Sequence, residues 1–357
     1  MPKKVLFLCP YPEKLAPSQR FRVELYKRYM DEVGVNYTIA GFMDEATWNV
    51  LYKGGSAPQK VWGIAKGYLK RIKTLLFDIH SYDYVFVHRE ASPLGPPVFE
   101  WMASKMWRKK MIYDFDDAIW IENTSAENKI AALLKAAWKV KYICKWSYKI
   151  SAGNDYLCNF ARKYNNNVYL VPTCVDVELM HNKVKQHHEG NVVVGWTGSH
   201  STLFYLDELI PVLQELQEEM PFTFLVIANK DPQLPLKHYS FTPWNEATEI
   251  QDLLQIDIGV MPLTPDKWSE GKCGFKLIQY LSLGIPAIAS PVGVNSKIVV
   301  NGENGYIATN REEWKDGIRK LIQNVSLRKT MGEAGRKKIV AEYSIQAHKD
   351  NFLALFS

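Results

Sequence analysis

The chain has no long apolar run. Of its 357 residues 47% are hydrophobic, yet no stretch approaches the roughly 18 apolar residues of a membrane-spanning helix. The N-terminal segment MPKKVLFLCPYP has a basic start but an apolar centre of only about five residues, where a signal peptide needs roughly 7 to 15. We therefore expect a cytoplasmic protein whose first structural element is a buried strand.

Cysteine is scarce and is not spaced for metal or disulfide chemistry. The chain has five cysteines, an odd number, and they lack the short spacings of a zinc site. Reduced thiols in a cytoplasmic protein are the simplest account. The P-loop pattern G-x-x-x-x-G-K-[ST] and the dinucleotide fingerprint G-x-G-x-x-G are also absent. These absences disfavour a disulfide scaffold, a P-loop NTPase and a dinucleotide-binding enzyme.

Charge is present but unevenly spread. The net charge is +6, but residues 1–150 hold 24 Lys and Arg against 15 Asp and Glu, which gives +9. The remaining residues hold 20 against 23, which gives −3. The N-terminal half therefore has the composition of a surface that meets something acidic.

Short apolar runs alternate with helix-length amphipathic segments along the whole chain. The expected strands are KVLFL, YTIAGF, YVFVH, MIYDF, YKISA and VYLVP in the first half, and NVVVGW, FTFLVIA, IDIGVMP and PAIAS in the second. The expected helices cover residues 18–33, 61–80, 93–108, 126–146, 201–219, 246–255, 275–283 and 311–323. This alternation is typical of βαβ units in a parallel sheet. The sequence therefore predicts an α/β protein of two Rossmann-like, doubly wound domains that face each other across a cleft.

The join between the two domains is expected in residues 171–190, which are polar and lack clear periodicity. We predict an N-terminal domain at residues 1–175 and a C-terminal domain at 176–340. Residues 341–357 are expected to form a C-terminal helix that packs back on the first domain. The histidines of the join, His181, His187 and His188, are expected to be solvated because no second ligand group stands at a defined spacing from them.

A glycine- and lysine-rich loop precedes one of the expected helices. In EGKCGFKLIQYL, Gly274 permits close approach of the backbone to a ligand, and the helix that follows presents unpaired amides near Phe275. Lys272 and Lys276 add positive charge. The sequence thus predicts a diphosphate site here. The alternative is a loop in which the glycines only shape a turn and the lysines are solvated.

A second loop of this kind follows the first strand of the C-terminal domain. In VVVGWTGSHST, Gly198 and Ser199 stand where a strand changes to a helix, which suits an anion or a sugar. The alternative is a tight turn in which a serine caps the helix. Trp244 and Glu249 of FTPWNEATEI could contact a base, or Trp244 could simply pack in the core.

Three segments of the C-terminal half carry a family resemblance. They are, in order, FTPWNEATEIQDLLQIDIGVMPL, GKCGFKLIQYLSLGIPAIASPVGVN and VNGENGYIA. In content and order these segments resemble the family-four retaining glycosyltransferases (glycosyl transferases group 1), which have the GT-B fold. The resemblance implies a nucleotide-sugar donor bound mainly by the C-terminal domain. It also implies transfer with retention of configuration, with no metal or other cofactor required.

The chain departs from this family at its acidic residues. The family usually has two glutamates separated by seven residues, and here these positions hold Gly271, next to Glu270, and Gln279. By resemblance Gln279 would meet the ribose hydroxyls, with less strength than a carboxylate. The diphosphate charge would then fall to Lys272 and Lys276, with Lys230 as a further donor contact.

The N-terminal domain should bind the acceptor. Arg20 and Arg22 follow the first strand, Arg89 ends another, and any of the three could hold a phosphate or a carboxylate. Asp116 and Asp117 end the strand MIYDF, close to Asp114.

The acidic cluster at 114–117 has three interpretations. It could bind a metal, it could orient or deprotonate an acceptor hydroxyl, or it could cap the next helix. Two Rossmann-like halves argue against a metal site, so we favour Asp116 and Asp117 at the acceptor.

Two basic segments of the N-terminal half have apolar residues at helical spacing. Residues 60–73 carry five Lys and Arg beside Trp62, Leu69 and Ile72, and residues 129–149 carry six lysines among aromatic residues. Such helices suit the headgroup layer of an anionic membrane. Alternatively, the apolar stripes face the core and the lysines are solvated. No motif for nucleic-acid binding is present.

The sequence thus predicts a cytoplasmic, membrane-peripheral glycosyltransferase that moves a sugar from a nucleotide-sugar to a glycan or lipid-linked acceptor. Lys272 and Lys276 would stabilise the leaving diphosphate. The alternatives are a nucleotide-sugar epimerase on the same fold and a nucleotide-sugar-binding protein without turnover.

Overall fold

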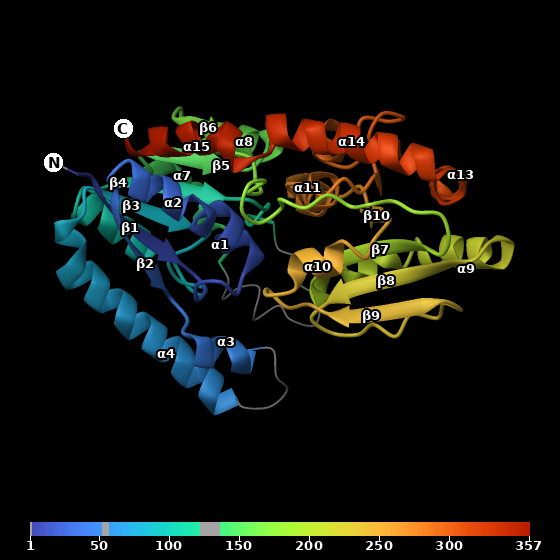
Figure 1. Ribbon diagram of the computed structural model, residues 1–357. Coiled ribbons are helices and arrows are strands. Elements are labelled where there is room, and N and C mark those ends of the chain that lie inside the picture. The colour runs from blue at the N-terminus through green and yellow to red at the C-terminus, as the bar shows by residue number, and fades with distance from the viewer. Residues whose placement is uncertain (1, 52–56, 122–135) are drawn as a thin grey trace. The chain divides into compact units, whose positions relative to one another are not determined.

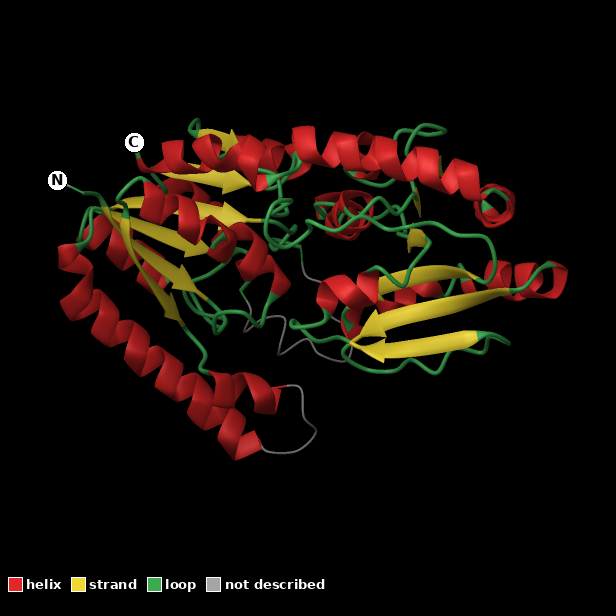
Figure 2. Ribbon diagram, viewed as in Figure 1, coloured by secondary structure: helices red, strands yellow, loops and turns green. Residues whose placement is uncertain are grey.

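The structure, a computed structural model, describes residues 2–51, 57–121 and 136–357 (Figure 1). The chain divides into two compact units. The first contains residues 1–173 together with 349–357, and the second contains residues 174–348. Each unit is built on one parallel six-stranded sheet with helices around it (Figure 2).

The sheet of the first unit has the strand order β2-β1-β3-β4-β5-β6, and every pairing is parallel. Its strands are β1 (Lys4–Cys9), β2 (Asn36–Gly41), β3 (Tyr84–His88), β4 (Lys110–Phe115), β5 (Lys149–Ala152) and β6 (Val168–Leu170). The central strands β1, β3 and β4 are almost completely buried, which explains why they are continuous apolar runs in the sequence.

The helices of the first unit connect these strands. They are α1 (Pro17–Arg22), η1 (Glu24–Tyr26), α2 (Lys27–Glu32), α3 (Glu45–Leu51), α4 (Ala57–Lys73), η2 (Thr74–Asp78), η3 (Ile79–Ser81), α5 (Val98–Trp101), η4 (Met102–Met106), α7 (Lys139–Trp146) and α8 (Asp155–Arg162). At the end of the chain, α15 (Ile345–Leu353) begins with residues of the second unit and ends with residues of the first, and η8 (Ala354–Phe356) follows it. The C-terminal aromatic residues complete this core. Phe352 stacks on Tyr26 with 3.9 Å between ring centroids, and Phe356 packs against Phe7 and Phe86.

The sheet of the second unit has the order β12-β11-β10-β7-β8-β9 and is also parallel throughout. Its strands are β7 (Val192–Gly198), β8 (Phe222–Ala228), β9 (Tyr239–Pro243), β10 (Ile258–Met261), β11 (Ala287–Ala289) and β12 (Gly305–Ile307). Its helices are η6 (His200–Leu206), α9 (Ile210–Glu219), α10 (Glu249–Leu253), η7 (Ser269–Gly271), α11 (Phe275–Ser282), α12 (Asn295–Ile298), α13 (Arg311–Gln323) and α14 (Val325–Glu342).

One core cluster of the second unit lies between its sheet and the helices α9 and α13. Trp196 and Phe224 of the sheet pack there with Leu213, Leu216 and Ile318 of the helices. On the other side, α11 lies against β10 because Gly259 has no side chain. A Cβ on Gly259 would overlap the ring of Tyr280. This close approach lets the second turn of α11 pack directly on β10.

The predicted α/β architecture is confirmed, and each expected strand is present. The short edge strands β9 and β12 were not expected. Residues of both are only partly buried, so neither is a continuous apolar run. Helix α14 was also missed, because its residues lack a strong amphipathic period. Of the helix expected at 126–146, residues 126–135 lie outside the described part of the chain.

The prediction that the histidines of the join are solvated is wrong for two of the three, which are buried. His181 is fully buried, and the His187 side chain is only 2% exposed, with its Nε2 2.9 Å from the carbonyl of Gly284. Burial is possible because the join packs on the second unit rather than standing free of it.

Candidate functional site

Helix α11 begins in a backbone conformation that only glycine adopts readily. Gly274, directly before the helix, has a φ of +66°, and a Cβ there would overlap Ile298 of α12. The first-turn amides of the helix, starting at Phe275, lie at the positive end of the helix dipole. The residue type at position 274 therefore places a helix N-terminus, which is chemically suited to an anion, beyond the carboxyl end of β10.

Lys276 brings this helix start against the loop after β7. Its Nζ lies 5.2 Å from the ring centroid of Trp196. A Cβ on Gly198 would come within 2.9 Å of Lys276 Cε and 2.5 Å of the Trp196 ring. The backbone amide of Thr197 donates to the hydroxyl of Tyr280 in α11 at 2.8 Å. The two glycine-containing loops that the sequence singled out are therefore neighbours within one unit.

Lys272 is held over two aromatic rings. Its Nζ lies 5.7 Å from the ring centroid of Tyr205 and 5.6 Å from that of Trp268. The Tyr205 hydroxyl in turn lies 2.8 Å from Ser269 Oγ. These contacts orient the ammonium group at the loop that leads into α11, where it adds to the positive potential of the helix start.

Gln279 is paired with a carboxylate from another helix. Its Nε2 donates to Glu249 Oε1 at 3.3 Å, and both residues are buried. Trp244 Nε1 donates to the same oxygen at 3.2 Å. A negative charge is thus present beside position 279, although it belongs to α10 rather than to α11.

Two further residues of the predicted donor site lie at the same edge of the sheet. Gly198 of β7 pairs with Ala228 of β8, so the exposed Lys230, two residues beyond β8, is on the adjacent strand end. Ser199 Oγ lies 2.9 Å from Ser201 Oγ, and the Ser199 carbonyl accepts the amide of Thr202 at the start of η6.

In the first unit, Arg22 is buried in an ion pair rather than available to an acceptor. The sequence predicted it beside the cleft as an acceptor contact, and in the structure its side chain is 1% exposed and ion-paired with Asp114. Asp114 also accepts from Ser151 Oγ at 2.6 Å. Burial alone would raise the pKa of Asp114, but the charge of Arg22 and the contact with His88 hold that pKa below its usual range. The reason for the difference is that Asp114 faces into the unit and needs a buried cation.

Arg20 is also buried. It is 5% exposed, and its guanidinium lies 5.1 Å from the ring centroid of Phe21. The guanidinium of this predicted acceptor contact is therefore largely covered within the first unit. The six residues of α1 bury four side chains, so the helix turns both arginines inward.

His88 and Ser18 extend the Asp114 network, and Ser18 was not anticipated. His88 Nδ1 lies 2.8 Å from Asp114 Oδ2, and its Nε2 lies 2.9 Å from Ser18 Oγ. A carboxylate only accepts hydrogen bonds, so the Nδ1 position carries the proton shared with Asp114. The position of Ser18 after β1 was the available signal, because loops after parallel strands meet at one edge of the sheet.

Arg89 holds the other two aspartates. Its Nε donates to Asp116 Oδ1 at 2.8 Å and its Nη2 to Asp117 Oδ2 at 3.0 Å. Burial would raise the pKa of Asp116, but the charges of Arg89 and His88 outweigh it and lower that pKa. Arg89 itself has a φ of +58°, an uncommon conformation for a residue with a side chain and one found often at functional sites. All three groups are partly exposed at the end of β3 and β4.

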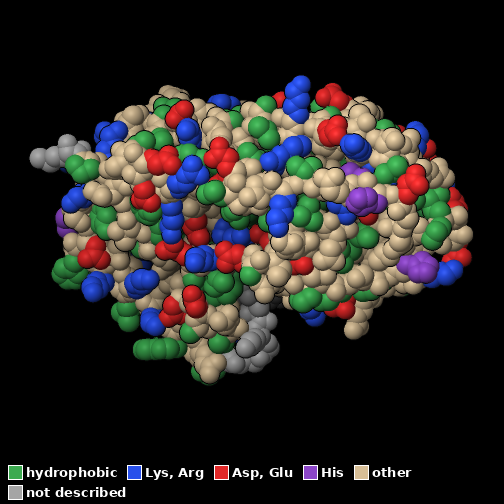
Figure 3. Space-filling model, viewed as in Figure 1, with side chains coloured by type: hydrophobic (Ala, Val, Ile, Leu, Met, Phe, Trp, Pro, Cys, Tyr) green, Lys and Arg blue, Asp and Glu red, His purple; other side chains and the backbone are tan. Residues whose placement is uncertain are grey.

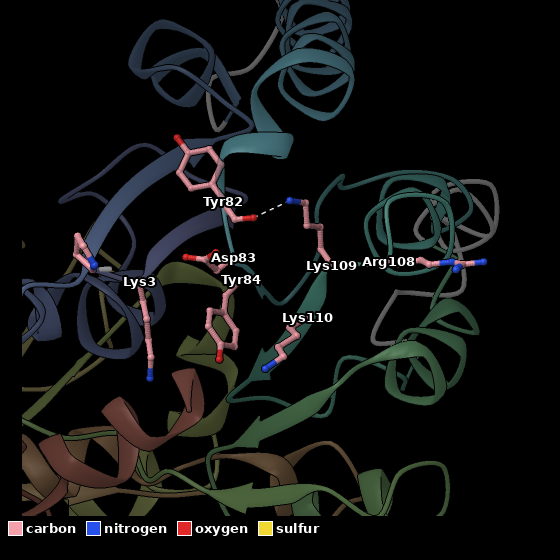
Figure 4. Close-up of a pocket in the computed structure, with 8 residues that line it drawn as sticks. Lys3, Tyr82, Asp83, Tyr84, Arg108, Lys109 and Lys110 are labelled. Atoms are coloured by element: carbon pink, nitrogen blue, oxygen red, sulfur yellow. Dashed lines mark hydrogen bonds between the residues drawn. The ribbon is translucent and has the colours of Figure 1, made fainter.

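Two cavities in the described part of the chain lie apart from these residues. One, of about 500 Å³, lies at the amino ends of β1, β3 and β4, and Lys3, Arg108 and Lys110 are among the residues that line it (Figure 4). The other, of about 640 Å³, lies beside β12 and α13. Among the described residues, no cluster of three or more His, Cys, Asp or Glu could hold a metal ion, and no helix is long and apolar enough to cross a membrane.

Comparison with known proteins supports the expected family. Residues 205–338 match the family model of the glycosyl transferases group 1. The chain is 27% identical over 223 residues to a protein of Methanocaldococcus jannaschii described as uncharacterized glycosyltransferase MJ1178. That match covers 58% of this chain and 60% of the relative.

Three solved structures are similar over nearly the whole chain. Sucrose-phosphate synthase from Thermosynechococcus elongatus has a TM-score of 0.73 at 11% identity, and the match covers 99% of this chain and 98% of the other. A glycosyltransferase from Rickettsia africae has a TM-score of 0.69 at 13% identity, with the same coverage. Anabaena HepE in complex with UDP and glucose has a TM-score of 0.63 at 13% identity, again with the same coverage. At these identities the likeness concerns the fold, which is the GT-B fold predicted from the sequence.

Proposed function

Because residues 205–338 match the family model of the glycosyl transferases group 1 and the chain has a GT-B fold, we propose that it is a retaining, metal-independent glycosyltransferase. It would move a sugar from a nucleotide-sugar donor to a glycan or lipid-linked glycan acceptor. The observation that carries this proposal is the meeting of Lys276, the loop at Gly198 and the start of α11 in one unit.

The donor diphosphate would bind at the start of α11. The amides after Gly274 and the ammonium groups of Lys272 and Lys276 offer positive charge where the leaving diphosphate develops negative charge. This arrangement needs no metal ion to neutralise the leaving group. The complexes of HepE with UDP, UDP-glucose, and UDP and glucose are consistent with a nucleotide-sugar donor.

The ribose would lie beside Gln279 and Glu249. Together an amide and a carboxylate offer the donor and acceptor groups that vicinal hydroxyls need. Trp244, which donates to the same carboxylate, would flank the base. In this proposal Glu249 supplies the charge that the family keeps at position 279.

The acceptor would meet the first unit at Arg89, Asp116 and Asp117. Arg89 would position an acceptor hydroxyl or phosphate, and the two aspartates would fix the direction of its guanidinium. Since the pKa of Asp116 is lowered, its carboxylate would serve as a hydrogen-bond acceptor rather than as a strong base. Arg22 would act indirectly, by holding Asp114 and with it His88.

We also propose that the enzyme works at the cytoplasmic face of an anionic membrane, where a lipid-linked acceptor would be found. The excess of basic residues in the N-terminal half supports this location. Nucleic acid is not among the proposed partners.

The proposal can be tested with a panel of nucleotide-sugars in the presence of EDTA. Thermal stabilisation by one donor, followed by its hydrolysis or transfer, is the expected result. Lys276→Ala should weaken nucleoside diphosphate binding by about tenfold or more, the loss of a charged hydrogen bond. Lys320→Ala is a matched control, because Lys320 is exposed on α13 and pairs with Asp316.

A nucleotide-sugar-binding protein without turnover is the second candidate. The glutamine at 279 and the glycine at 271 favour it, since relatives keep glutamates there. Stabilisation by a donor without hydrolysis or transfer to any acceptor would support this candidate and contradict the enzyme. Unchanged diphosphate affinity in Lys276→Ala would contradict the proposed binding site.

A further inference from the structure

Helix α4 has an apolar stripe that is exposed. Val61, Trp62 and Leu69 are 69%, 67% and 62% exposed, and Ile72 is 42% exposed. In η2, which continues α4, Phe77 is 71% exposed. Large apolar side chains are scattered singly over most protein surfaces, but a row of them on one helix indicates an interaction site.

The stripe lies opposite the face by which α4 packs on its own unit. The buried residues of α4 are Gly63, Gly67 and Arg71. A Cβ at Gly63 would come within 2.5 Å of Thr47, and one at Gly67 within 2.5 Å of Phe42. Since successive helical residues are about 100° apart, the four exposed residues of α4 occupy a sector of about 100° on the far side of the helix. The core of the unit therefore does not account for them.

Arg71 ties the inner face of α4 to the sheet edge. Its guanidinium donates to the carbonyls of Cys9, Ala40 and Ala91 at 2.9 to 3.1 Å. Such an anchor, together with the two close glycine contacts, keeps the outer face directed to solvent. The helix cannot turn its stripe inward without breaking these bonds.

Lysines border the stripe. Lys66, Lys70 and Lys73 are exposed and follow next to it around the helix, and α4 contains no acidic residue. Lys66 Nζ is paired with the carboxylate of Asp44 at 2.6 Å, which partly neutralises its charge. Lys70 and Lys73 are therefore the better candidates for contact with an external anion. Figure 3 shows hydrophobic and basic side chains side by side along the lower left edge, where Figure 1 places α4.

A basic cluster lies beyond the end of the helix. Lys109 Nζ donates to the carbonyls of His80 and Tyr82, which joins the segment before β4 to η3. Arg108 and Lys110 next to it are exposed and line the cavity at the amino ends of the strands (Figure 4). Positive charge thus continues from the α4 surface to this edge of the sheet.

The exposed apolar residues are unequally divided between the units. Of 20 large hydrophobic residues that are exposed in the described part of the chain, 16 belong to the first unit and four to the second. The first unit is also the one with the excess of positive charge. Both features therefore mark the same unit.

We propose that the outer face of α4 is the surface by which this protein docks on an anionic lipid bilayer, with the helix axis lying in the membrane plane. The proposal rests on the proposed function only in assuming that the acceptor is at a membrane. Trp62, Leu69 and Ile72 enter the boundary between headgroups and acyl chains, while Lys70 and Lys73 meet lipid phosphates. A second copy of the chain is a poorer occupant, because two such stripes face to face would also bring lysines against lysines.

Vesicle sedimentation tests this surface directly. The full chain is mixed with vesicles of phosphatidylcholine and phosphatidylglycerol, or of phosphatidylcholine alone. We expect the parent protein to bind the anionic vesicles. The affinity of Leu69→Asp/Ile72→Asp for these vesicles should be at least tenfold lower. Val33→Asp is the matched control, because Val33 is 58% exposed in the same unit but outside α4.

The lysines give a second, graded readout. Lys70→Gln/Lys73→Gln should lower the affinity for anionic vesicles by about fivefold for each charge removed, and the effect should fade in high salt. Equal binding by the parent and by Leu69→Asp/Ile72→Asp would overturn the proposal. So would a parent dimer that this variant converts to a monomer, since the stripe would then be a self-association surface.

The same variants separate this proposal from the proposed function. Both pairs of substitutions belong to the first unit, whereas Lys276 and Gly198 belong to the second, so nucleoside diphosphate binding measured without vesicles should be unchanged. Vesicle binding without nucleotide binding would contradict the enzyme alone. Nucleotide binding by a protein that binds neither kind of vesicle would contradict the docking surface alone.

Discussion

At the scale of single residues, the pairing of Gln279 with Glu249 is the most informative contact of the second unit. A glutamine amide can donate to a carboxylate, whereas two carboxylates 3.3 Å apart would repel each other. The substitution of glutamine at position 279 is therefore matched to the glutamate of α10. A negative charge is thus present beside position 279, and it comes from α10.

The first prediction follows from this match. Gln279→Glu should weaken nucleoside diphosphate binding by about tenfold or more, because like charges meet and a charged hydrogen bond is lost. The exchange Glu249→Gln/Gln279→Glu should restore most of the affinity, as measured by calorimetric titration. If the double variant binds as weakly as the single one, the pairing is not what holds the ribose.

The second prediction concerns Asp116 and pH. Its pKa is lowered in the folded protein, so the carboxylate stabilises the fold above its ordinary pKa of about 3.9 and loses that effect as pH falls. Asp116→Asn should therefore be less stable than the parent at pH 7, and the difference should shrink on acidification below about pH 4. Urea unfolding at pH 7 and pH 3 measures this. A stability difference independent of pH would contradict the assignment.

At the scale of elements, the start of α11 depends on the conformation of one glycine. Gly274 combines a positive φ with a Cβ position already occupied by Ile298. The helix can therefore begin there only if position 274 has no side chain. Strand β10 and helix α12 fix the two sides of this turn.

The third prediction compares two glycines. Gly274→Ala should lower stability by more than the roughly 1 kcal/mol that a positive φ costs, and should also weaken diphosphate binding. Gly302→Ala is the control, since Gly302 has a φ of +81° but nothing within 4 Å of its Cβ position. Thermal unfolding and nucleotide titration of both variants test this. Equal effects on stability would show that the overlap with Ile298 is relieved at no cost.

At the scale of the whole molecule, the end of the chain is part of the first unit. Residues 349–357 supply Phe352 and Phe356, both about 1% exposed, to a core otherwise formed by residues 1–173. The core of the first unit is therefore completed by residues that follow the whole second unit in the sequence. Its stability depends on residues that are distant in the sequence from the strands they contact, since Phe356 packs against Phe7 of β1 and Phe86 of β3.

The fourth prediction tests this dependence. Phe352→Ala should destabilise the first unit by about 3–5 kcal/mol, the cost of removing a buried aromatic side chain. Tyr26 loses its stacking partner in the process. Limited proteolysis should show cleavage of the first unit at lower denaturant concentration, with the second unit unaffected. Equal loss of resistance in both units would contradict an effect confined to one core.

The sequence by itself determined ten of the twelve strands that the structure describes, the two Rossmann-like halves and the loop at Gly274. Each of these depends on local patterns, such as continuous apolar runs or a glycine before a helix, that have the same meaning wherever they occur. The sequence also located the apolar stripe of residues 60–73. It left open whether that stripe faces the core or the solvent.

Only the tertiary structure decided the remaining points. Glu249 meets Gln279 across 30 positions, and Arg22 meets Asp114 across 92, so no local pattern could pair them. The stripe of α4 is exposed because Gly63 and Gly67 let the opposite face pack more closely. Burial is a property of what surrounds a residue, and those surroundings come from segments that are distant in the sequence.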